Sequence, residues 1–201
     1  MKVTSIILAG GKNKRLGQNK ATMTIDGQIV IERIVDRLTP FTDQFIVVAG
    51  WGTPDPPIYR NIEVITDLFP KLGPLGGIYT GLQASQALCN VVVACDMPFL
   101  NTKLLEYMIG LSCNFDAVIP KLGKGKTEPL HAIYSKNCLN YIQMQLELKI
   151  LEVNYFLNKV HVRYVQKTEC QRLDPQLLSF FNINYQSDLD QAITLTAVND
   201  H

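Results

Sequence analysis

The sequence predicts an α/β protein with a three-layer α/β/α architecture, in which helices cover both faces of a mainly parallel, mixed sheet. One observation behind this prediction is that candidate strands such as residues 3–9 (VTSIILA) and 90–95 (NVVVAC) are apolar along nearly their whole length. The other is that these strands alternate with segments of helical periodicity. Continuous apolar strands have to be covered on both faces, and their alternation with helices is typical of a parallel sheet.

The first half of the chain contains four expected strands and two expected helices. After the strand over 3–9, a helix is expected over 30–40, because Ile31, Ile34, Val35 and Leu38 recur on one face and Pro40 ends the pattern. Short apolar runs predict strands over 44–50 (QFIVVAG) and 63–66 (EVIT). Residues 76–88 have a helical pattern despite Gly81, and the strand over 90–95 follows them.

The second half continues the alternation. Apolar runs predict strands over 115–120 (FDAVIP) and 130–134 (LHAIY), and residues 159–165 (KVHVRYV) alternate in the manner of a strand. Helical patterns are expected over residues 102–111, 136–148, 151–158 and 186–195.

Length and composition indicate one domain over residues 1–201. Hydrophobic residues make up 47% of the chain and charged residues 18%, which favours a packed core over disorder. The formal net charge of +1 argues against a general nucleic-acid polyelectrolyte. No segment reaches the roughly 18 consecutive apolar residues of a membrane helix. We therefore expect neither nucleic acid nor membrane among the partners.

The five cysteines favour a reducing compartment. Their number is odd and no pair has CxxC spacing, which argues against both a disulfide framework and a structural zinc site. The apolar run 3–9 stops at Gly10 and Gly11 without a cleavage-type region, so no secretory signal is expected. The sequence predicts a cytoplasmic protein.

Four stretches are predicted to meet at one edge of the sheet. In an open α/β sheet, ligands bind where loops leave the carboxyl ends of the strands. This rule brings together the loop after Ala9, the region around Asp67, the residues after Cys95 and the loop after Pro120.

The loop after Ala9 has the composition of a polyphosphate site. Gly10 and Gly11 allow the backbone to approach a ligand closely, and exposed amides can bind phosphate oxygens. Four cations, Lys12, Lys14, Arg15 and Lys20, follow without an intervening acid. Neither the P-loop spacing nor a GxGxxG fingerprint is present, so this is either a phosphate loop of another kind or a solvated basic turn.

Two aspartates follow strands at the same predicted edge. Asp96 comes directly after the apolar strand 90–95, and a carboxylate there suits Mg²⁺, which binds few carboxylates together with phosphate oxygens. The alternative role of Asp96 is to cap the following turn. Asp67 ends the strand over 63–66, and the glycine-rich residues 73–77 (GPLGG) follow it near the start of a helix.

The chain resembles a known family in four motifs. The segments LAGGKNKRLGQNKA, DLFPKLGPLGGI, CDMPFL and FNINYQSDLDQA occur in the order and spacing of the MobA-type molybdenum cofactor guanylyltransferases, members of the nucleotidyltransferase superfamily. The resemblance covers residues 3–195. It implies a Rossmann-like nucleotidyltransferase fold, with a nucleotide-binding part over about residues 1–100 and an acceptor-binding part over about 101–195.

The resemblance also implies site residues. Leu8, Ala9, Gly10 and Gly11 correspond to the backbone segment that holds the nucleotide, and Arg15 and Lys20 to residues that contact the triphosphate. Asp67 corresponds to a nucleotide contact, and Asp96 to a nucleotide contact that also binds Mg²⁺. Asn182 and Asn184 correspond to residues near the pterin or its phosphate. Arg15, Lys20 and Asp96 are the expected catalytic residues.

This chain departs from the family pattern at two informative places. Gly50-Trp51 stands where the family commonly has an Asn after the second strand, and Asn184-Tyr185-Gln186 replaces the usual Asn-Thr-Pro. The family also usually has Met at the position of Leu16 and Ala at that of Gly76.

The implied reaction transfers GMP from GTP to the terminal phosphate of molybdopterin, forming the guanine dinucleotide cofactor and pyrophosphate. Arg15, Lys20 and a magnesium ion on Asp96 suit the binding of two polyanions, and no general base is needed. Lys121, Lys124 and Lys126 next to Glu128 form either an acceptor-side loop or a solvated one, and His131 is expected in the core. The alternatives are a transferase that uses CTP or another phosphate acceptor, and a non-catalytic nucleotide-binding or cofactor-delivery module in contact with molybdoenzymes.

Overall fold

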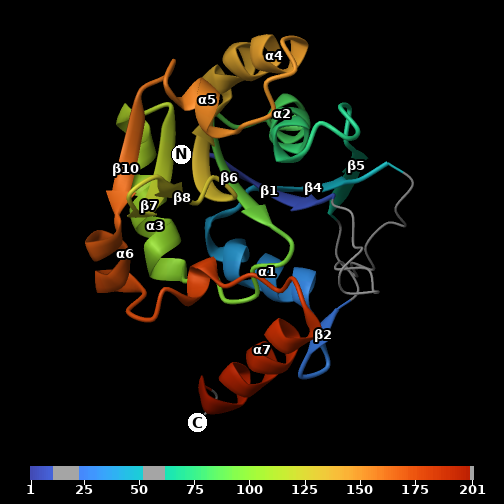
Figure 1. Ribbon diagram of the computed structural model, residues 1–201, viewed down its shortest axis with the longest axis vertical. Helices are drawn as coiled ribbons and strands as arrows, with labels where there is room; N and C mark the ends of the chain where they lie inside the picture. Colours follow the sequence, from blue (N-terminus) through green and yellow to red (C-terminus); the bar gives the residue numbers. More distant parts are fainter. Residues whose placement is uncertain (11–22, 52–61, 200–201) are drawn as a thin grey trace.

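The computed structural model describes residues 1–10, 23–51 and 62–199. Eight of the described strands form one sheet in the order β10-β7-β9-β6-β1-β4-β5, with β8 paired to β7 (Figure 1). Their bounds are β1 Val3–Ala9, β4 Gln44–Ala49, β5 Glu63–Thr66, β6 Cys89–Ala94, β7 Ala117–Gly123, β8 Lys126–Thr127, β9 His131–Ser135 and β10 Val162–Gln166.

The sheet is mainly parallel and mixed, as predicted. Strand β1 lies at its centre and pairs in parallel with β4 on one side and β6 on the other. Strands β4 and β5 are parallel, and so are β7 and β10. Among the described strands of the sheet, only β9 and the short β8 run against their neighbours. The carboxyl ends of β6, β1, β4 and β5 therefore lie side by side along one edge.

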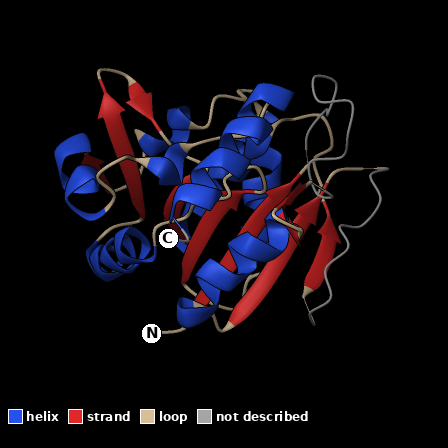
Figure 2. Ribbon diagram, turned by 90° about the horizontal axis from the view of Figure 1, so that it is seen from below, coloured by secondary structure: helices blue, strands red, loops and turns tan. Residues whose placement is uncertain are grey.

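Helices cover both faces of this sheet (Figures 1 and 2). One face packs against α1 (Val30–Leu38), α3 (Thr102–Leu111) and α6 (Lys167–Leu173). Helix α7 (Gln186–Asn199) lies beside β2 (Thr24–Ile25) and adds Leu189 and Ala192 to the same core. The other face packs against α2 (Pro74–Ala84), α4 (Leu139–Glu147) and α5 (Asn154–Leu157). Strand β1 contributes side chains to the hydrophobic cores on both faces of the sheet. Val3 and Ile7 lie in the core beneath α1 and α3, and Ile6 and Leu8 lie in the core beneath α2 and α4. The three-layer prediction is confirmed.

Glycines bring α2 unusually close to β1. A Cβ atom on Gly81 would lie 2.3 Å from Cγ2 of Ile6, and one on Gly77 would lie 3.2 Å from Cδ2 of Leu8. Any larger side chain at position 81 would push the helix off the sheet. This packing explains why a glycine stands inside a helix, where it is otherwise unfavourable. The helix begins at Pro74, earlier than predicted, and ends at Ala84.

The structure contains several short elements that the sequence reading missed. A two-stranded hairpin joins β2 (Thr24–Ile25) and β3 (Gln28–Ile29), and its turn residues Asp26 and Gly27 have φ angles of 50° and 76°. Helix α6 and strand β8 were also missed. Of the predicted helices, 136–148 is a 3₁₀ turn followed by α4, 151–158 shortens to α5, and 186–195 extends to Asn199.

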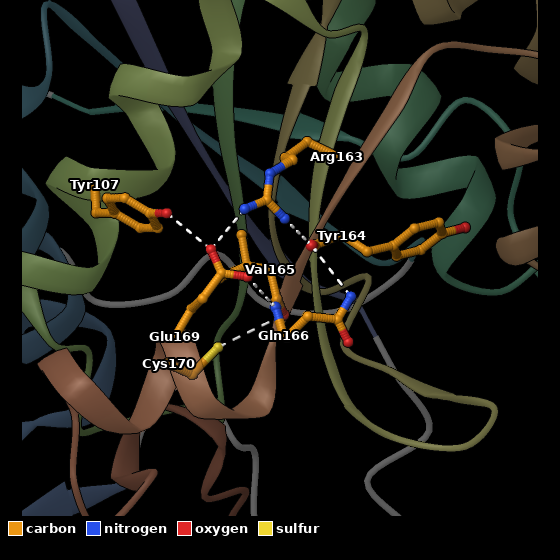
Figure 3. Close-up of polar contacts among 7 residues, drawn as sticks. All are labelled: Tyr107, Arg163, Tyr164, Val165, Gln166, Glu169 and Cys170. Carbon is orange, nitrogen blue, oxygen red and sulfur yellow. Dashed lines mark hydrogen bonds and ion pairs between the residues drawn. The ribbon is translucent and has the colours of Figure 1, made fainter.

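A polar cluster fastens α6 to the rest of the protein (Figure 3). Glu169 of α6 accepts hydrogen bonds from the Tyr107 hydroxyl on α3 at 2.8 Å and from the Gln166 amide at 2.9 Å, and it pairs with Arg163 of β10 at 2.5 Å. Burial alone would raise the pKa of this carboxyl, but the Gln166 amide, Arg163 and Tyr107 together hold that pKa below its usual range.

Within the described ranges, no helix combines the length and the apolar character needed to cross a membrane.

Candidate active site

The carboxyl ends of four parallel strands bring the predicted segments together. Ala9 of β1 is in register with Ala49 of β4, which is in register with Thr66 of β5. On the other side, Leu8 is in register with Ala94 of β6. The chain continues from these strand ends into Gly10, Gly50, Asp67 and Asp96. The structure thus places Asp67 and Asp96 on the two sides of Gly10. We call Leu8, Ala9, Gly10 and Gly11 the glycine segment.

The glycine segment begins at the end of a buried strand. Leu8 is buried, Ala9 is partly buried and Gly10 is exposed. The Leu8 carbonyl accepts a hydrogen bond from the Cys95 amide at 3.1 Å, which fixes the end of β1 to the turn that carries Asp96. Gly11, Arg15 and Lys20 lie outside the described residues, so their predicted roles stay predictions.

Asp67 is held in one orientation by its surroundings. Its amide donates to the Ala49 carbonyl at 2.9 Å, which extends the pairing of β4 and β5 by one residue. Its Oδ1 accepts from the Phe69 amide at 2.9 Å and from the Thr80 hydroxyl at 3.2 Å. No described residue donates a hydrogen bond to its Oδ2.

The packing around Asp67 requires a glycine at position 76. A Cβ atom there would lie 2.9 Å from both the carbonyl oxygen and Cβ of Phe69, and 3.2 Å from Oδ1 of Asp67. Real Cβ atoms essentially never approach other heavy atoms as closely as the first of these distances. Gly76 therefore lets the turn after β5 lie directly on the first turn of α2.

Asp96 connects the end of β6 to residues 181–185, which lead into α7 and which we call the closing segment. It follows β6 at the edge of the sheet and is partly buried. Its carbonyl accepts a hydrogen bond from the Ile183 amide at 3.0 Å, and Ile183 is itself fully buried. Asn182 and Asn184 flank this buried residue, so both lie next to Asp96 in space although they are far from it in sequence.

The closing segment has its own supports. The Asn182 side chain donates to the Phe180 carbonyl at 3.0 Å. Asp188, in the first turn of α7, accepts from the amides of Asn184 at 2.8 Å and Tyr185 at 2.9 Å. A carboxylate that reaches back to amides at a helix start is one half of a capping box. Asp188 and Thr80 were not singled out from the sequence. Of these two, only Asp188 could have been found from the sequence, because it lies three residues after Tyr185, which is the spacing of a capping box.

His131 is a core residue, as predicted. It is fully buried in β9, and its ring meets that of Phe180 edge to face with 5.0 Å between centroids. Neither ring nitrogen has a hydrogen-bond partner in the part of the chain that the structure describes. Burial lowers the pKa of His131 to about 4, so the ring is neutral near pH 7. These features are unlike those of a general base in contact with substrate.

The hairpin of β7 and β8 extends beyond the same edge of the sheet. Lys121 lies over the Tyr164 ring, 5.3 Å from its centroid, and Lys126 pairs with Glu128 at 3.8 Å. Burial raises the pKa of the Glu128 carboxyl although Lys126 opposes this effect. The Glu128 amide donates to the Pro120 carbonyl at 3.0 Å. Lys126 thus lies beside the half-buried Glu128 carboxylate, on the side predicted for the acceptor.

The carboxylates at this edge are donors of the kind that magnesium binds. Among the described residues, no group of three His, Cys, Asp or Glu side chains is arranged to hold a metal. Magnesium is commonly bound by one or two carboxylates together with substrate phosphates and water. Asp67 and Asp96 are two carboxylates of the described residues that lie at this edge.

A cavity of about 280 Å³ lies at the opposite edge of the sheet. Its lining includes Met1, Cys89 and Ser135, which lie at the amino ends of β1 and β6 and at the carboxyl end of β9. The cavity is therefore separate from the candidate active site.

Comparison with known proteins shows which family the chain is similar to. The model of the MobA-like NTP transferase domain family matches residues 5–155. A molybdenum cofactor guanylyltransferase of Desulfosudis oleivorans is 36% identical over 192 residues, covering 94% of each chain. A probable molybdenum cofactor guanylyltransferase of Pelotomaculum thermopropionicum is 33% identical, covering 96% of this chain and 92% of the relative. The crystal structure of molybdopterin-guanine dinucleotide biosynthesis protein A from Archaeoglobus fulgidus is also similar. It has a TM-score of 0.80 and 27% identity, and covers 96% of this chain and 98% of the other.

Proposed function

Since the chain belongs to the family of MobA-like NTP transferase domains, we propose that it transfers GMP from GTP to the terminal phosphate of molybdopterin. The products are the guanine dinucleotide form of the molybdenum cofactor and pyrophosphate. The observation that carries this proposal is the hydrogen bond from Ile183 to Asp96, by which the closing segment joins the edge that carries the glycine segment and Asp67. Similarity to the Desulfosudis guanylyltransferase over nearly the whole of both chains supports it further.

The reaction is a substitution at the α-phosphorus of GTP. An oxygen of the acceptor phosphate forms a new P–O bond, and the bond to the bridging oxygen of the β-phosphate breaks, so that pyrophosphate leaves with the electron pair. The second pKa of a phosphate monoester is about 6, so the nucleophile is already largely ionised near neutrality. The neutral, buried His131 is compatible with this chemistry because no general base is required.

The main task of the site is to hold two polyanions in line and to stabilise the leaving group. We assign Arg15 and Lys20 to the triphosphate, as cations in the loop that follows Gly11. Mg²⁺, held by Asp96 and phosphate oxygens, would neutralise charge that develops on the leaving pyrophosphate. Asp96 is suited to this role because the Ile183 and Cys95 backbone contacts fix the turn in which it lies.

The nucleotide and the acceptor are assigned to different parts of the chain. Residues 1–100 would hold GTP, through the backbone of Leu8, Ala9, Gly10 and Gly11 and the side chain of Asp67. Residues 101–195 would hold the acceptor, with Asn182 and Asn184 near the pterin or its phosphate. The lysines of the β7–β8 hairpin and Glu128 lie on this side. The whole chain 1–201 would act as one nucleotidyltransferase domain.

The proposed place of action is the cytoplasm, in transient contact with other cofactor-biosynthesis proteins or with molybdoenzymes. The proposal is tested by incubating the protein with molybdopterin, Mg²⁺ and GTP and measuring both pyrophosphate and the dinucleotide product. Activity with CTP alone would instead indicate the cytidylyl enzyme, and nucleotide binding without turnover would indicate a delivery module.

A further inference from the structure

Helix α4 has an apolar side that no described part of the protein covers. One side of this helix packs into the core through Ile142 and Leu146. Its other apolar side is formed by Tyr141, Met144 and Leu148, whose spacing places them along one stripe of the helix. Figure 1 shows α4 at the upper margin of the molecule, beside α5 and far from α7.

The segment after α4 enlarges this stripe. Gln145 is buried, and its side-chain amide donates to the carbonyls of Ile150 at 2.8 Å and Glu152 at 2.7 Å. These two bonds hold the chain after α4 against the helix, next to the stripe. Leu151 lies between these two carbonyls, and the Tyr155 amide donates to the Glu152 carbonyl at 3.1 Å, so both residues are grouped with the stripe. We name the five residues the α4–α5 face: Tyr141 (43% exposed), Met144 (61%), Leu148 (68%), Leu151 (40%) and Tyr155 (44%).

The area of the α4–α5 face suits an interface. A large apolar or aromatic side chain has roughly 150–250 Å² of surface, so these exposed fractions amount to on the order of 500 Å². This is near the upper end of what a monomeric protein exposes in one patch. If two such faces met, they would bury on the order of 1,000 Å² before any surrounding residue is counted, which is about the lower limit for a specific interface.

The charge distribution of α4 favours pairing with an antiparallel copy of itself. Glu147, near the carboxyl end, is the only charged residue of the helix. Antiparallel pairing places Glu147 beside the positive, amino-terminal end of the opposite helix, while parallel pairing would place two Glu147 side chains together. With the symmetry axis near Met144, Tyr141 of one copy meets Leu148 of the other, so apolar groups match along the stripe.

We propose that the α4–α5 face is the interface of a two-fold symmetric homodimer, with α4 of one copy packed antiparallel to α4 of a second copy. The same surface on both subunits makes a closed assembly, which is the commonest form of homo-oligomer. The strand ends that carry Gly10, Asp67 and Asp96 belong to other elements than the α4–α5 face.

Sedimentation velocity on the full chain, from low to high micromolar concentration, tests the proposal. The unmodified protein should show a monomer–dimer equilibrium. Met144→Glu/Leu148→Glu should abolish the dimer, since it places four carboxylates in the apolar interface. Ile193→Glu on α7, another exposed apolar position on a helix, should dimerise as the unmodified protein does. Far-ultraviolet circular dichroism checks that each variant is folded.

A cross-linking experiment tests the position of the symmetry axis. In a Cys113→Ser background, which removes the exposed cysteine, Met144→Cys should form a disulfide-linked dimer under mild oxidation, whereas Ile193→Cys should not. A protein that stays monomeric at the highest concentration overturns the proposal, even if the face then binds a different protein. A dimer that survives the double glutamate substitution also overturns it.

Discussion

The Ile183 amide donates a hydrogen bond of 3.0 Å to the carbonyl of Asp96, and this contact joins the two ends of the candidate active site. Asp96 belongs to the turn after β6, whereas Ile183 belongs to the segment that leads into α7. Because Ile183 is fully buried between Asn182 and Asn184, the position of both asparagines depends on the turn at Asp96. This contact therefore joins the parts of the chain that we assign to the nucleotide and to the acceptor.

Asp96→Asn should reduce kcat by at least a hundredfold while the fold is kept. The substitution preserves the size of the side chain and the backbone contact with Ile183, but removes the charge that we assign to Mg²⁺ binding. Loss of a metal ligand costs several kcal/mol of transition-state stabilisation. Turnover at saturating GTP and Mg²⁺, together with thermal unfolding, measures both effects.

Asp190→Asn on the exposed side of α7 is the matched control and should be fully active. Near-normal turnover of Asp96→Asn, with Mg²⁺ still required, would contradict the assignment of Asp96.

Lys20→Ala should lower kcat more than it raises KM for GTP. We assign Lys20 to the triphosphate, where negative charge moves toward the leaving pyrophosphate in the transition state. An interaction that is stronger there than in the ground state affects kcat. Steady-state kinetics with varied GTP separate the two parameters. A variant with normal kcat and only weaker GTP binding would make Lys20 a ground-state contact.

The sequence was most informative where a single segment determines its own structure. Apolar runs located β1, β4, β5 and β6, and the strand order of an α/β sheet then brought Gly10, Asp67 and Asp96 to one edge. The resemblance to a family supplied roles for Arg15 and Lys20, which remain predictions because these residues lie outside the described ranges.

Features that depend on unusual local chemistry or on tertiary contacts were missed. The Asp26-Gly27 turn is a recognised hairpin signal, but its two-residue strands are too short to show periodicity. Helix α6 begins with a capping box in which Gln166 takes the place of the usual Ser or Thr. The bond between Ile183 and Asp96 connects the middle of the chain to the segment that leads into α7, and no local pattern encodes it.

Gly76→Ala should weaken GTP binding and destabilise the protein by about 1–3 kcal/mol. The added Cβ would lie 2.9 Å from the Phe69 carbonyl oxygen, which is backbone and cannot simply rotate away. The turn that orients Asp67 would have to shift. The family usually has Ala at this position, whereas in this chain the Phe69 carbonyl oxygen and Cβ lie where that Cβ would be. Chemical denaturation and nucleotide titration measure the two changes.

Gly110→Ala in α3 provides the matched control. A Cβ atom at position 110 meets no atom within 4 Å, and alanine is the better helix former. This variant should be at least as stable as the unmodified protein and should bind GTP normally. Equal stability and GTP affinity in Gly76→Ala and the unmodified protein would show that the turn adapts without cost.

Glu169→Gln should destabilise the protein at neutral pH by about 1 kcal/mol, because the ion pair with Arg163 is lost and the hydrogen bonds around it weaken. The pKa of Glu169 is lower in the folded than in the unfolded protein. Its contribution is therefore fully present above the unfolded pKa and is lost as the pH falls through the folded value. The difference between the two proteins should shrink below about pH 4.

Urea denaturation at several pH values measures this difference. Glu106→Gln, an exposed position on α3, should show no such dependence. A constant difference between Glu169→Gln and the unmodified protein across the pH range would assign the effect to packing.

GTP should be preferred over ATP and CTP by at least about tenfold in kcat/KM. Oδ1 of Asp67 is occupied by Phe69 and Thr80, whereas Oδ2 accepts no hydrogen bond from any described residue. Guanine presents N1–H and an exocyclic amine as donors, which a carboxylate and backbone carbonyls can accept, and an O6 acceptor for a loop amide. Adenine reverses the key donor and acceptor positions, and each buried mismatch costs roughly 1–3 kcal/mol. One mismatch is enough for a tenfold preference.

The missing family Asn at Gly50 removes one contact, so the preference would depend more strongly on Asp67 in this chain. Asp67→Asn should then reduce the preference for GTP, since the amide offers a donor where guanine also donates. Parallel pyrophosphate-release assays with the three nucleotides and molybdopterin measure the ratios. Equal or better use of CTP would reject the guanine assignment in favour of a cytidylyltransferase.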